Sequence, residues 1–277
     1  MAINEKRREI AFFYISYHNV NIIFKYFEVA FMKILEEKFK AKLLKFISNE
    51  KSGELIVLKK ILEDDKNRTG DYPSSPGMAN LNKIKSTGEK AFQRAIFNKK
   101  KTILNYKGLG RTDIITWFDL ELPITFNKNS RRRCLDLIGF SDDTPIICEL
   151  KYYETTPSNQ PIYAVVELLV YYYFILCNYK KLDKYNIHHH LADNDFKWKT
   201  IAEKPKPKLL VAANSVYWNR WFKKIDKNTL TKQVAKLGKE LNIEIYLFEA
   251  VNEDFILQKN SRPTFNPAIT SNIWREI

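Results

Sequence analysis

The sequence predicts an α/β fold in which a central mixed β-sheet is flanked by helices and an N-terminal helical region precedes it. Three observations predict this fold. Short runs of β-branched and aliphatic residues bounded by polar turns, which are typical of strands, recur between residues 114 and 251. Longer stretches with apolar residues three and four positions apart, which are typical of helices, alternate with these runs. Such alternation favours a layered arrangement of helices on a sheet.

The first part of the chain is expected to be helical. In residues 5–47 apolar side chains recur at helical spacing without Pro or Gly, so we assign residues 1–62 to an N-terminal helical region. Residues 63–82 are rich in Pro, Gly and charged side chains and are predicted to form an exposed linker. Residues 83–277 form the second predicted domain. The sequence leaves open whether the helical region packs on this domain or forms a homo-oligomer. It also leaves open whether this region binds a partner protein or a substrate.

A helix is predicted to begin near Glu89. Ser and Thr residues just before it are good helix caps, and the following residues keep an apolar stripe at helical spacing. The segment from Ile114 to Leu120 is rich in β-branched and aromatic residues and is predicted to be a strand. We expect Asp119 and Glu121 to lie on its solvent face.

The most informative segment is a predicted hairpin. The pattern predicts two strands, at residues 134–140 and 145–152, joined by a polar four-residue turn. Because side chains alternate along a strand, Glu149 and Lys151 share a face. Asp136 lies on the neighbouring strand, thirteen positions before Glu149, where its carboxylate can reach the same cation.

The residue types at this hairpin suit phosphodiester chemistry. Mg²⁺ takes oxygen ligands, usually one or two carboxylates with water and phosphate oxygens at the remaining positions. Asp136 and Glu149 are candidates for these carboxylates. The ammonium of Lys151 can orient an attacking water or stabilise charge on the phosphate. The alternative is an ordinary ion pair on an exposed strand.

Through Leu135-Asp136 and Glu149-Leu150-Lys151 the chain resembles the PD-(D/E)xK nuclease superfamily, with Leu135 where the family name has Pro. The resemblance covers roughly residues 86–250 and implies a restriction-endonuclease-like core and a Mg²⁺ or Mn²⁺ ion. It implies catalytic roles for Glu89, Asp136, Glu149 and Lys151, of which Glu89, Asp136 and Glu149 would hold the metal.

A buried helix is predicted from Pro161 to Leu176, because this run is strongly apolar and opens with Pro. The RecB-type branch of the superfamily carries a Gln-x-x-x-Tyr motif here. In this chain Gln160 has Ala164 four positions on, whereas Glu167 and Tyr171 have the required spacing with Glu in place of Gln. Gln160, Glu167 and Tyr171 are therefore supporting candidates. The carboxylate of Glu167 either faces the site or is paired internally.

The rest of the chain completes the predicted sheet. A buried strand is expected to begin at Leu209, a helix to run from Leu230 to Asn242, and a strand to run from Ile243 to Val251.

Composition points to a polyanionic partner. The chain has 46 Lys and Arg against 32 Asp and Glu, a formal charge of +14. Nucleic acid, and by the resemblance DNA, is the natural partner. The alternative is a Lys-rich sequence whose solvated surface happens to be basic. The candidate nucleic-acid-binding residues are Lys99, Lys100, Lys101, Arg131, Arg132 and Arg133.

A cytoplasmic location without a membrane is expected. The three cysteines fall in apolar segments and read as reduced core residues. The apolar run after Pro161 is shorter than a bilayer span and contains Glu167. No zinc-binding spacing of Cys and His occurs.

These observations favour a metal-dependent nuclease that hydrolyses DNA, and analogy with the superfamily suggests an effector of anti-phage defence or restriction. Two other hypotheses stay open. The first is a non-catalytic nucleic-acid-binding or assembly protein that retains the fold. The second is a structural partner of a larger complex in which the motif is coincidental.

Overall fold

The computed structural model describes most of the chain after residue 32. The described residues are 33–50, 53–64, 88–107, 110–123, 134–153, 159–185, 197–202, 206–251, 255–259, 265–269 and 272–277. The chain divides into two compact units, residues 1–41 and 42–277, and the features below belong to the second unit. Most of the predicted linker at 63–82 lies outside the described residues, so the predicted domain boundary stays a prediction.

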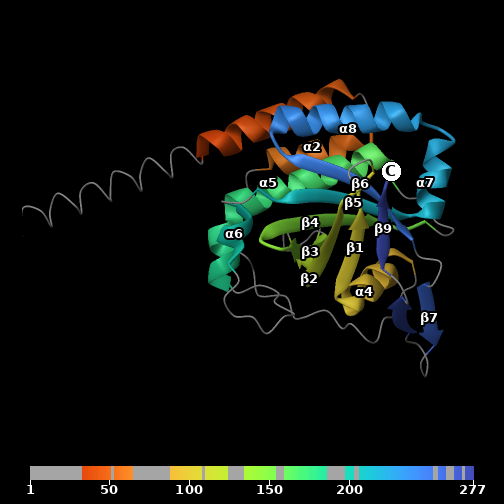
Figure 1. Ribbon diagram of the computed structural model, residues 1–277. Coiled ribbons are helices and arrows are strands. Elements are labelled where there is room, and N and C mark those ends of the chain that lie inside the picture. Colours follow the sequence, from red (N-terminus) through yellow and green to blue (C-terminus); the bar gives the residue numbers. More distant parts are fainter. Residues whose placement is uncertain are drawn as a thin grey trace, which may run out of the picture. The chain divides into compact units, whose positions relative to one another are not determined.

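The main sheet contains seven strands in the order β1-β2-β3-β4-β5-β6-β9 (Figure 1). Their bounds are β1 Lys101–Asn105, β2 Thr112–Pro123, β3 Cys134–Ser141, β4 Thr144–Lys151, β5 Lys208–Asn214, β6 Glu244–Val251 and β9 Ile273–Glu276. The first four strands pair antiparallel, whereas β4, β5 and β6 pair parallel. A separate two-stranded sheet joins β7 (Phe255–Lys259) to β8 (Phe265–Ile269).

The main sheet closes into a barrel, because β9 pairs antiparallel with β6 and parallel with β1. The predicted α/β class with a mixed sheet is confirmed, but the predicted open sheet flanked by helices is wrong. The reason is the short strand β9, for which the sequence gives no periodic pattern. Its Trp274 is fully buried, with its ring centroid 5.7 Å from that of Trp117 and 6.5 Å from that of Phe248.

One hydrophobic core draws side chains from all seven strands and from helix α4 (Glu89–Lys99). Cys148 and Leu150 of β4 belong to this core. Because strand side chains alternate, Glu149 and Lys151 point to the opposite face of the sheet. Helix α5 (Pro161–Tyr185) contacts β4 and β5 and carries Glu167, a hydrogen-bond partner of Lys151.

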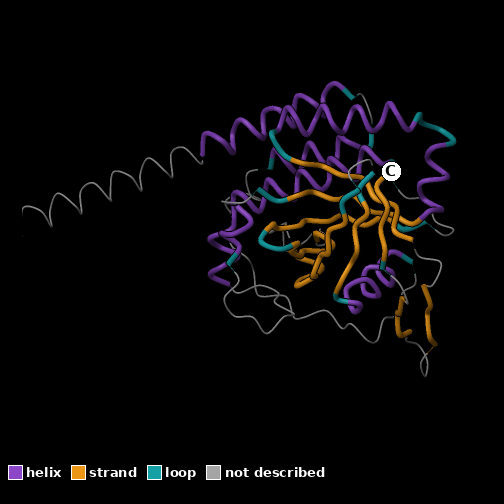
Figure 2. The backbone as a smooth tube through the Cα atoms, viewed as in Figure 1, coloured by secondary structure: helices purple, strands orange, loops and turns teal. Residues whose placement is uncertain are grey.

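The other helices cover neighbouring strands, and Figure 2 shows them in purple with the strands in orange. Helix α7 (Ser215–Phe222) contacts β5 and β6, and α8 (Lys227–Leu241) contacts β6 and α5. Helix α6 (Trp198–Ala202) packs on α5, as does α2 (Leu55–Glu63).

The helix boundaries follow local signals. The predicted start near Glu89 is confirmed, but the cap position is held by Gly88 without a side-chain cap rather than by Ser or Thr, and its φ of 83° favours glycine. Asp226 caps α8 by accepting a hydrogen bond from the backbone N–H of Thr229. The helix ends at the left-handed Asn242, as the sequence predicts.

Two acidic residues of β2 do not lie on a solvent face, contrary to the expectation. Asp119 is fully buried and follows a register shift between Trp117 and Asp119. Burial raises the pKa of its carboxyl well above the usual range, although the Leu120 N–H donates to Oδ1 at 2.9 Å. Glu121 accepts a hydrogen bond from Arg94 at 3.1 Å. The irregular register turns both residues away from the face that simple alternation predicts.

Helix α5 is a buried helix, as predicted. By length and composition alone it could cross a membrane, but 83% of its most apolar window is buried inside the protein. Core helices of water-soluble proteins have the same properties, so α5 carries little weight for a membrane. None of the three cysteines forms a disulfide, and only Cys148 is a buried core residue, whereas Cys134 and Cys177 are half-buried.

Candidate active site

The β3–β4 hairpin brings Asp136 and Glu149 together. Its register pairs Leu137 with Cys148, so the next position along each strand sets Asp136 opposite Glu149. The backbone N–H of Leu150 donates to Asp136 Oδ2 at 2.7 Å. The two carboxylates therefore arise from adjacent strands at the end of the hairpin that is distant from its turn.

Helix α4 reaches the same end of the hairpin with Glu89 and Gln93, which lie one helical turn apart. Gln93 Nε2 donates to the backbone carbonyl of Asp136 at 2.7 Å and to its Oδ1 at 3.3 Å. Glu89 Oε2 accepts a hydrogen bond from the backbone N–H of Tyr152 at 3.3 Å. The helix thus positions Asp136 directly and places Glu89 beside the end of β4.

Lys151 joins the strand residues to α5. Its Nζ donates to Glu149 Oε1 at 2.7 Å and to Glu167 Oε2 at 3.1 Å. The Tyr171 hydroxyl donates to Glu167 Oε1 at 2.9 Å. Glu149, Lys151 and Glu167 each expose 6% of their surface or less. The carboxylate of Glu167 is therefore paired inside the protein, and its partner Lys151 is one of the candidate catalytic residues.

The electrostatics of this cluster follow from burial and from mutual repulsion. Burial raises the pKa of Asp136 well above its usual range, and the neighbouring Glu89 raises it further. Burial and the charge of Asp136 do the same to the pKa of Glu149. The charged forms of Asp136 and Glu149 are therefore penalised, and a bound cation would offset this penalty.

For Lys151 and Glu167, neighbouring charges outweigh the effect of burial on the pKa and favour the charged forms. Burial would lower the pKa of Lys151, but the surrounding carboxylates, Glu149 foremost, raise it well above its usual range. Burial would raise the pKa of Glu167, but Lys151 and the Tyr171 hydroxyl hold it below its usual range. At neutral pH, Lys151 and Glu167 form a buried ion pair.

The donor set fits a hard divalent ion. Among the described residues, no group donates a hydrogen bond to the buried Glu149 Oε2, a condition that a cation would relieve. Within the described part of the chain, no group of three or more Asp, Glu, His or Cys side chains is already arranged as a metal site. Mg²⁺ needs only one or two protein carboxylates, because water and phosphate oxygens fill the other positions, so Asp136 and Glu149 meet its requirement.

The remaining predicted residues lie outside this cluster. Gln160 precedes α5, and its backbone carbonyl accepts hydrogen bonds from the N–H groups of Tyr163 and Ala164. Lys99 and Lys101 are exposed at the end of α4 distant from Glu89, about 15 Å along the helix.

Between them, the Nζ of Lys100 lies 4.1 Å from the ring centroid of Phe97, and burial lowers the pKa of Lys100. The structure therefore does not bring these three lysines to the cluster. Arg131, Arg132 and Arg133 fall outside the described residues.

Gln93 is the site residue that the sequence analysis missed. Its signal is a spacing of four from Glu89 on the predicted helix, which puts both side chains on one helical face. A Gln at this position is otherwise an ordinary helix residue, so only the contact with Asp136 reveals its role.

Replacing Gln93 by Leu is expected to reduce metal-dependent activity about 10- to 100-fold, because Asp136 loses the amide that orients it. The half-saturating Mg²⁺ concentration should rise in parallel, a change that a purely structural role would not produce. Gln233→Leu, which removes an amide bonded to Glu50 rather than to a residue of the cluster, is the matched control and should leave both quantities unchanged. An unchanged Mg²⁺ dependence in Gln93→Leu would contradict the positioning role.

Comparison with protein-family models, with curated protein sequences and with solved structures finds no match for this chain. The function is therefore argued from the geometry of the site.

Proposed function

We propose that this protein is a metal-dependent nuclease that hydrolyses phosphodiester bonds in DNA, with a PD-(D/E)xK type of site. The observation that supports the proposal is the convergence of Asp136 and Glu149 from adjacent strands beside Lys151. Glu149 contributes a buried oxygen to which no described residue donates a hydrogen bond.

Asp136 and Glu149 would hold Mg²⁺ or Mn²⁺, with Glu89 as the third acidic residue within electrostatic reach of Asp136. When bound, the ion would lower the pKa of a coordinated water and offset charge on the phosphate. Because the pKa values of both ligands are raised, they would release protons as they bind the ion, and metal affinity is expected to increase with pH.

The protein's own residues then position the reacting groups. Lys151 keeps its proton at neutral pH, so it serves as a fixed cation that stabilises charge on the phosphate oxygens, rather than as a general base. Glu167 and Tyr171 hold the ammonium in place through hydrogen bonds of 3.1 and 2.9 Å. Gln93 and the Leu150 N–H fix the Asp136 carboxylate in the same way.

Nucleic acid suits the charge of the chain. A formal charge of +14 favours a polyanion, and neutralising several phosphates would make binding strongly dependent on salt. DNA as the substrate, a cytoplasmic location and a role in anti-phage defence or restriction follow from the likeness of the motif to the nuclease superfamily.

The test is a cleavage assay on supercoiled plasmid, linear duplex and single-stranded DNA. We expect cleavage by the wild-type chain with Mg²⁺ or Mn²⁺, loss of cleavage in EDTA, and loss in Asp136→Ala and Lys151→Ala. Equal activity of the wild type and both variants would contradict the proposed nuclease function. Thermal melting of each protein checks that the variants are folded.

The second candidate is a non-catalytic nucleic-acid-binding protein with the same fold. It is favoured by the fact that, among the described residues, no three Asp, Glu, His or Cys side chains are grouped so that they could hold a metal ion. A mobility shift that weakens with salt, without cleavage under any divalent ion, would distinguish it from the nuclease.

A further inference from the structure

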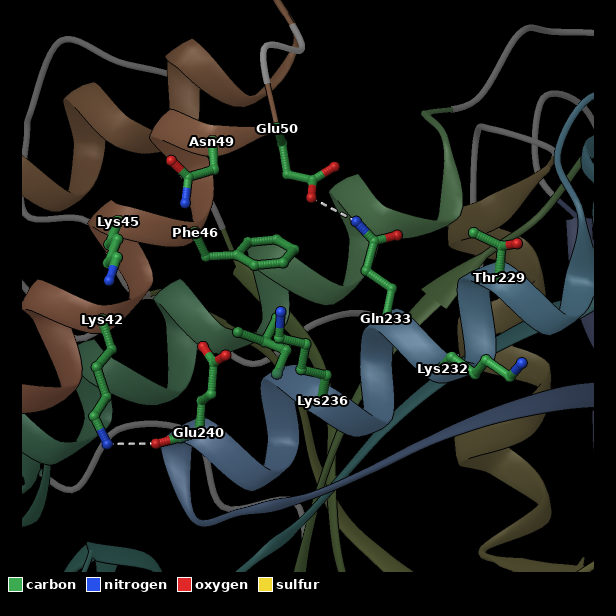
Figure 3. A pocket seen from close by; sticks show the side chains of 11 residues that line it. Lys42, Lys45, Phe46, Asn49, Glu50, Thr229, Lys232, Gln233, Lys236 and Glu240 are labelled. Atoms are coloured by element: carbon green, nitrogen blue, oxygen red, sulfur yellow. Dashed lines mark hydrogen bonds between the residues drawn. The ribbon is translucent and has the colours of Figure 1, made fainter.

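A concave site lies between the helical residues 42–49 and helix α8 (Figure 3). Its volume is about 830 Å³, within the range of roughly 300–1,000 Å³ that is usual for small-molecule pockets. None of its lining residues belongs to the cluster around Asp136 and Lys151.

The lining of this pocket is basic. Its charged residues are Lys42, Lys45, Lys232, Lys236, Glu50 and Glu240. The ammonium of Lys42 donates to the backbone carbonyl of Glu240, and Glu50 accepts a hydrogen bond from Gln233.

Three lysines that line the pocket are not paired with any acidic side chain that the structure describes. Across the described ranges, no side-chain hydrogen bond or ion pair involves the ammonium groups of Lys45, Lys232 and Lys236, although Lys232 lies within electrostatic reach of Asp226. In an ordinary groove between packed helices, opposite charges at facing positions pair with one another. Here three lysines are among the residues that line one hollow, which makes it attractive to an anion with several negative charges.

An aromatic ring lies among these charges. Figure 3 shows the ring of Phe46 between the two helices, with Asn49 one turn further along the same helix. Leu43 and Ile47 of this helix are buried, so they anchor it while Phe46 remains partly exposed to the hollow. A ring face beside amide groups suits a planar heterocycle, because stacking on an aromatic side chain tolerates any base.

From these contacts we propose that the pocket binds a nucleotide, with its phosphates near Lys45, Lys232 and Lys236 and its base against Phe46. The inference does not depend on the proposed nuclease activity. The same chemistry is available from a free nucleotide or from one nucleotide of a single strand, and the experiment separates these sources.

The test measures binding to the full chain in EDTA by titration calorimetry, with ATP, inorganic tripolyphosphate and a short single-stranded oligonucleotide as probes. Lys45→Gln/Lys236→Gln is expected to weaken ATP binding at least about 10-fold, because two charge-assisted contacts are lost. Lys223→Gln/Lys239→Gln removes the same charge from exposed positions outside the pocket and should change the affinity less than about twofold. Phe46→Leu should weaken ATP but not tripolyphosphate.

Comparing the probes distinguishes a free nucleotide from one nucleotide of a single strand as the ligand. ATP binding that depends on the pocket lysines identifies a free nucleotide, and oligonucleotide binding with the same dependence but no ATP binding identifies a strand. No binding of either probe, or equal losses in the pocket and control double variants, would overturn the proposal. Asp136→Ala should bind ATP as the wild type does, so failure of the nuclease assay and failure of the pocket are separate results.

Discussion

Replacing Glu149 by Gln is expected to reduce cleavage about 1,000-fold and at the same time to stabilise the folded protein at neutral pH. The loss of activity follows because the site loses the carboxylate with the unpartnered oxygen, and several kcal/mol of transition-state stabilisation correspond to about three powers of ten in rate. The gain in stability follows because burial and Asp136 penalise the charged form of Glu149, whereas an amide has no charge to bury.

The pH dependence has a definite sign. The folded-state pKa of Glu149 is raised, so the folded protein binds this proton more tightly than the unfolded chain does. The free energy of unfolding of the wild type therefore falls as pH rises from the ordinary carboxyl pKa of 4.5 toward the raised value. Because the Gln variant lacks this loss, its stability advantage should grow between pH 5 and about pH 8.

Urea unfolding across this pH range, together with a plasmid cleavage assay, measures both effects. Glu63→Gln, at an exposed position of α2, is the matched control and should alter neither. Retention of activity would remove Glu149 from the chemistry. A loss of stability that does not depend on pH would show that its charge is not penalised in the fold.

Replacing Lys151 by Met is expected to abolish cleavage and to destabilise the protein, the reverse of the Glu149 result. The variant leaves Glu149 and Glu167 without the cation that each contacts in the wild type. Removing one partner of a buried ion pair typically costs about 3–5 kcal/mol. We expect a loss of this size in the free energy of unfolding at pH 8.

The deficit of the Lys151→Met protein should shrink as pH falls. In the wild type the lowered pKa of Glu167 contributes stability above its unfolded value, and this contribution disappears in acid. In the variant both carboxyls must take up protons on folding, which becomes easier at low pH. Unfolding experiments at several pH values test this, with Lys223→Met as the exposed control. A deficit that is equal at pH 5 and pH 8 would contradict the ion-pair account.

Local patterns in the sequence predicted the parts of the site that depend on local geometry. Strand alternation and a short hairpin turn suffice to set Glu149 and Lys151 on one face, with Asp136 opposite Glu149. A helix start at Glu89 likewise follows from adjacent residues. These features depend on contacts between residues close in the chain, or on the fixed periods of strands and helices.

Other features depend on tertiary contacts that no local pattern encodes. Gln93 gains its role only where α4 meets Asp136, and the burial of Asp119 follows from a register shift in the middle of β2. The pairing of Ile103 with Ile273 joins segments at opposite ends of the domain sequence, so the sequence could not show that the sheet closes.

The closing strand has a consequence for how the chain acquires its structure. β9 follows the other six strands of the barrel in the sequence, so during synthesis from the N-terminus β1 and β6 are made before the partner that they share. Until β9 arrives, each presents unpaired backbone groups that can recruit a strand from another chain. Pairing between strands so distant in the sequence forms slowly, and slow closure favours aggregation of the nascent protein. Truncation before Ile273, or slower synthesis, should therefore lower the yield of soluble protein even though the residues of the site are unchanged.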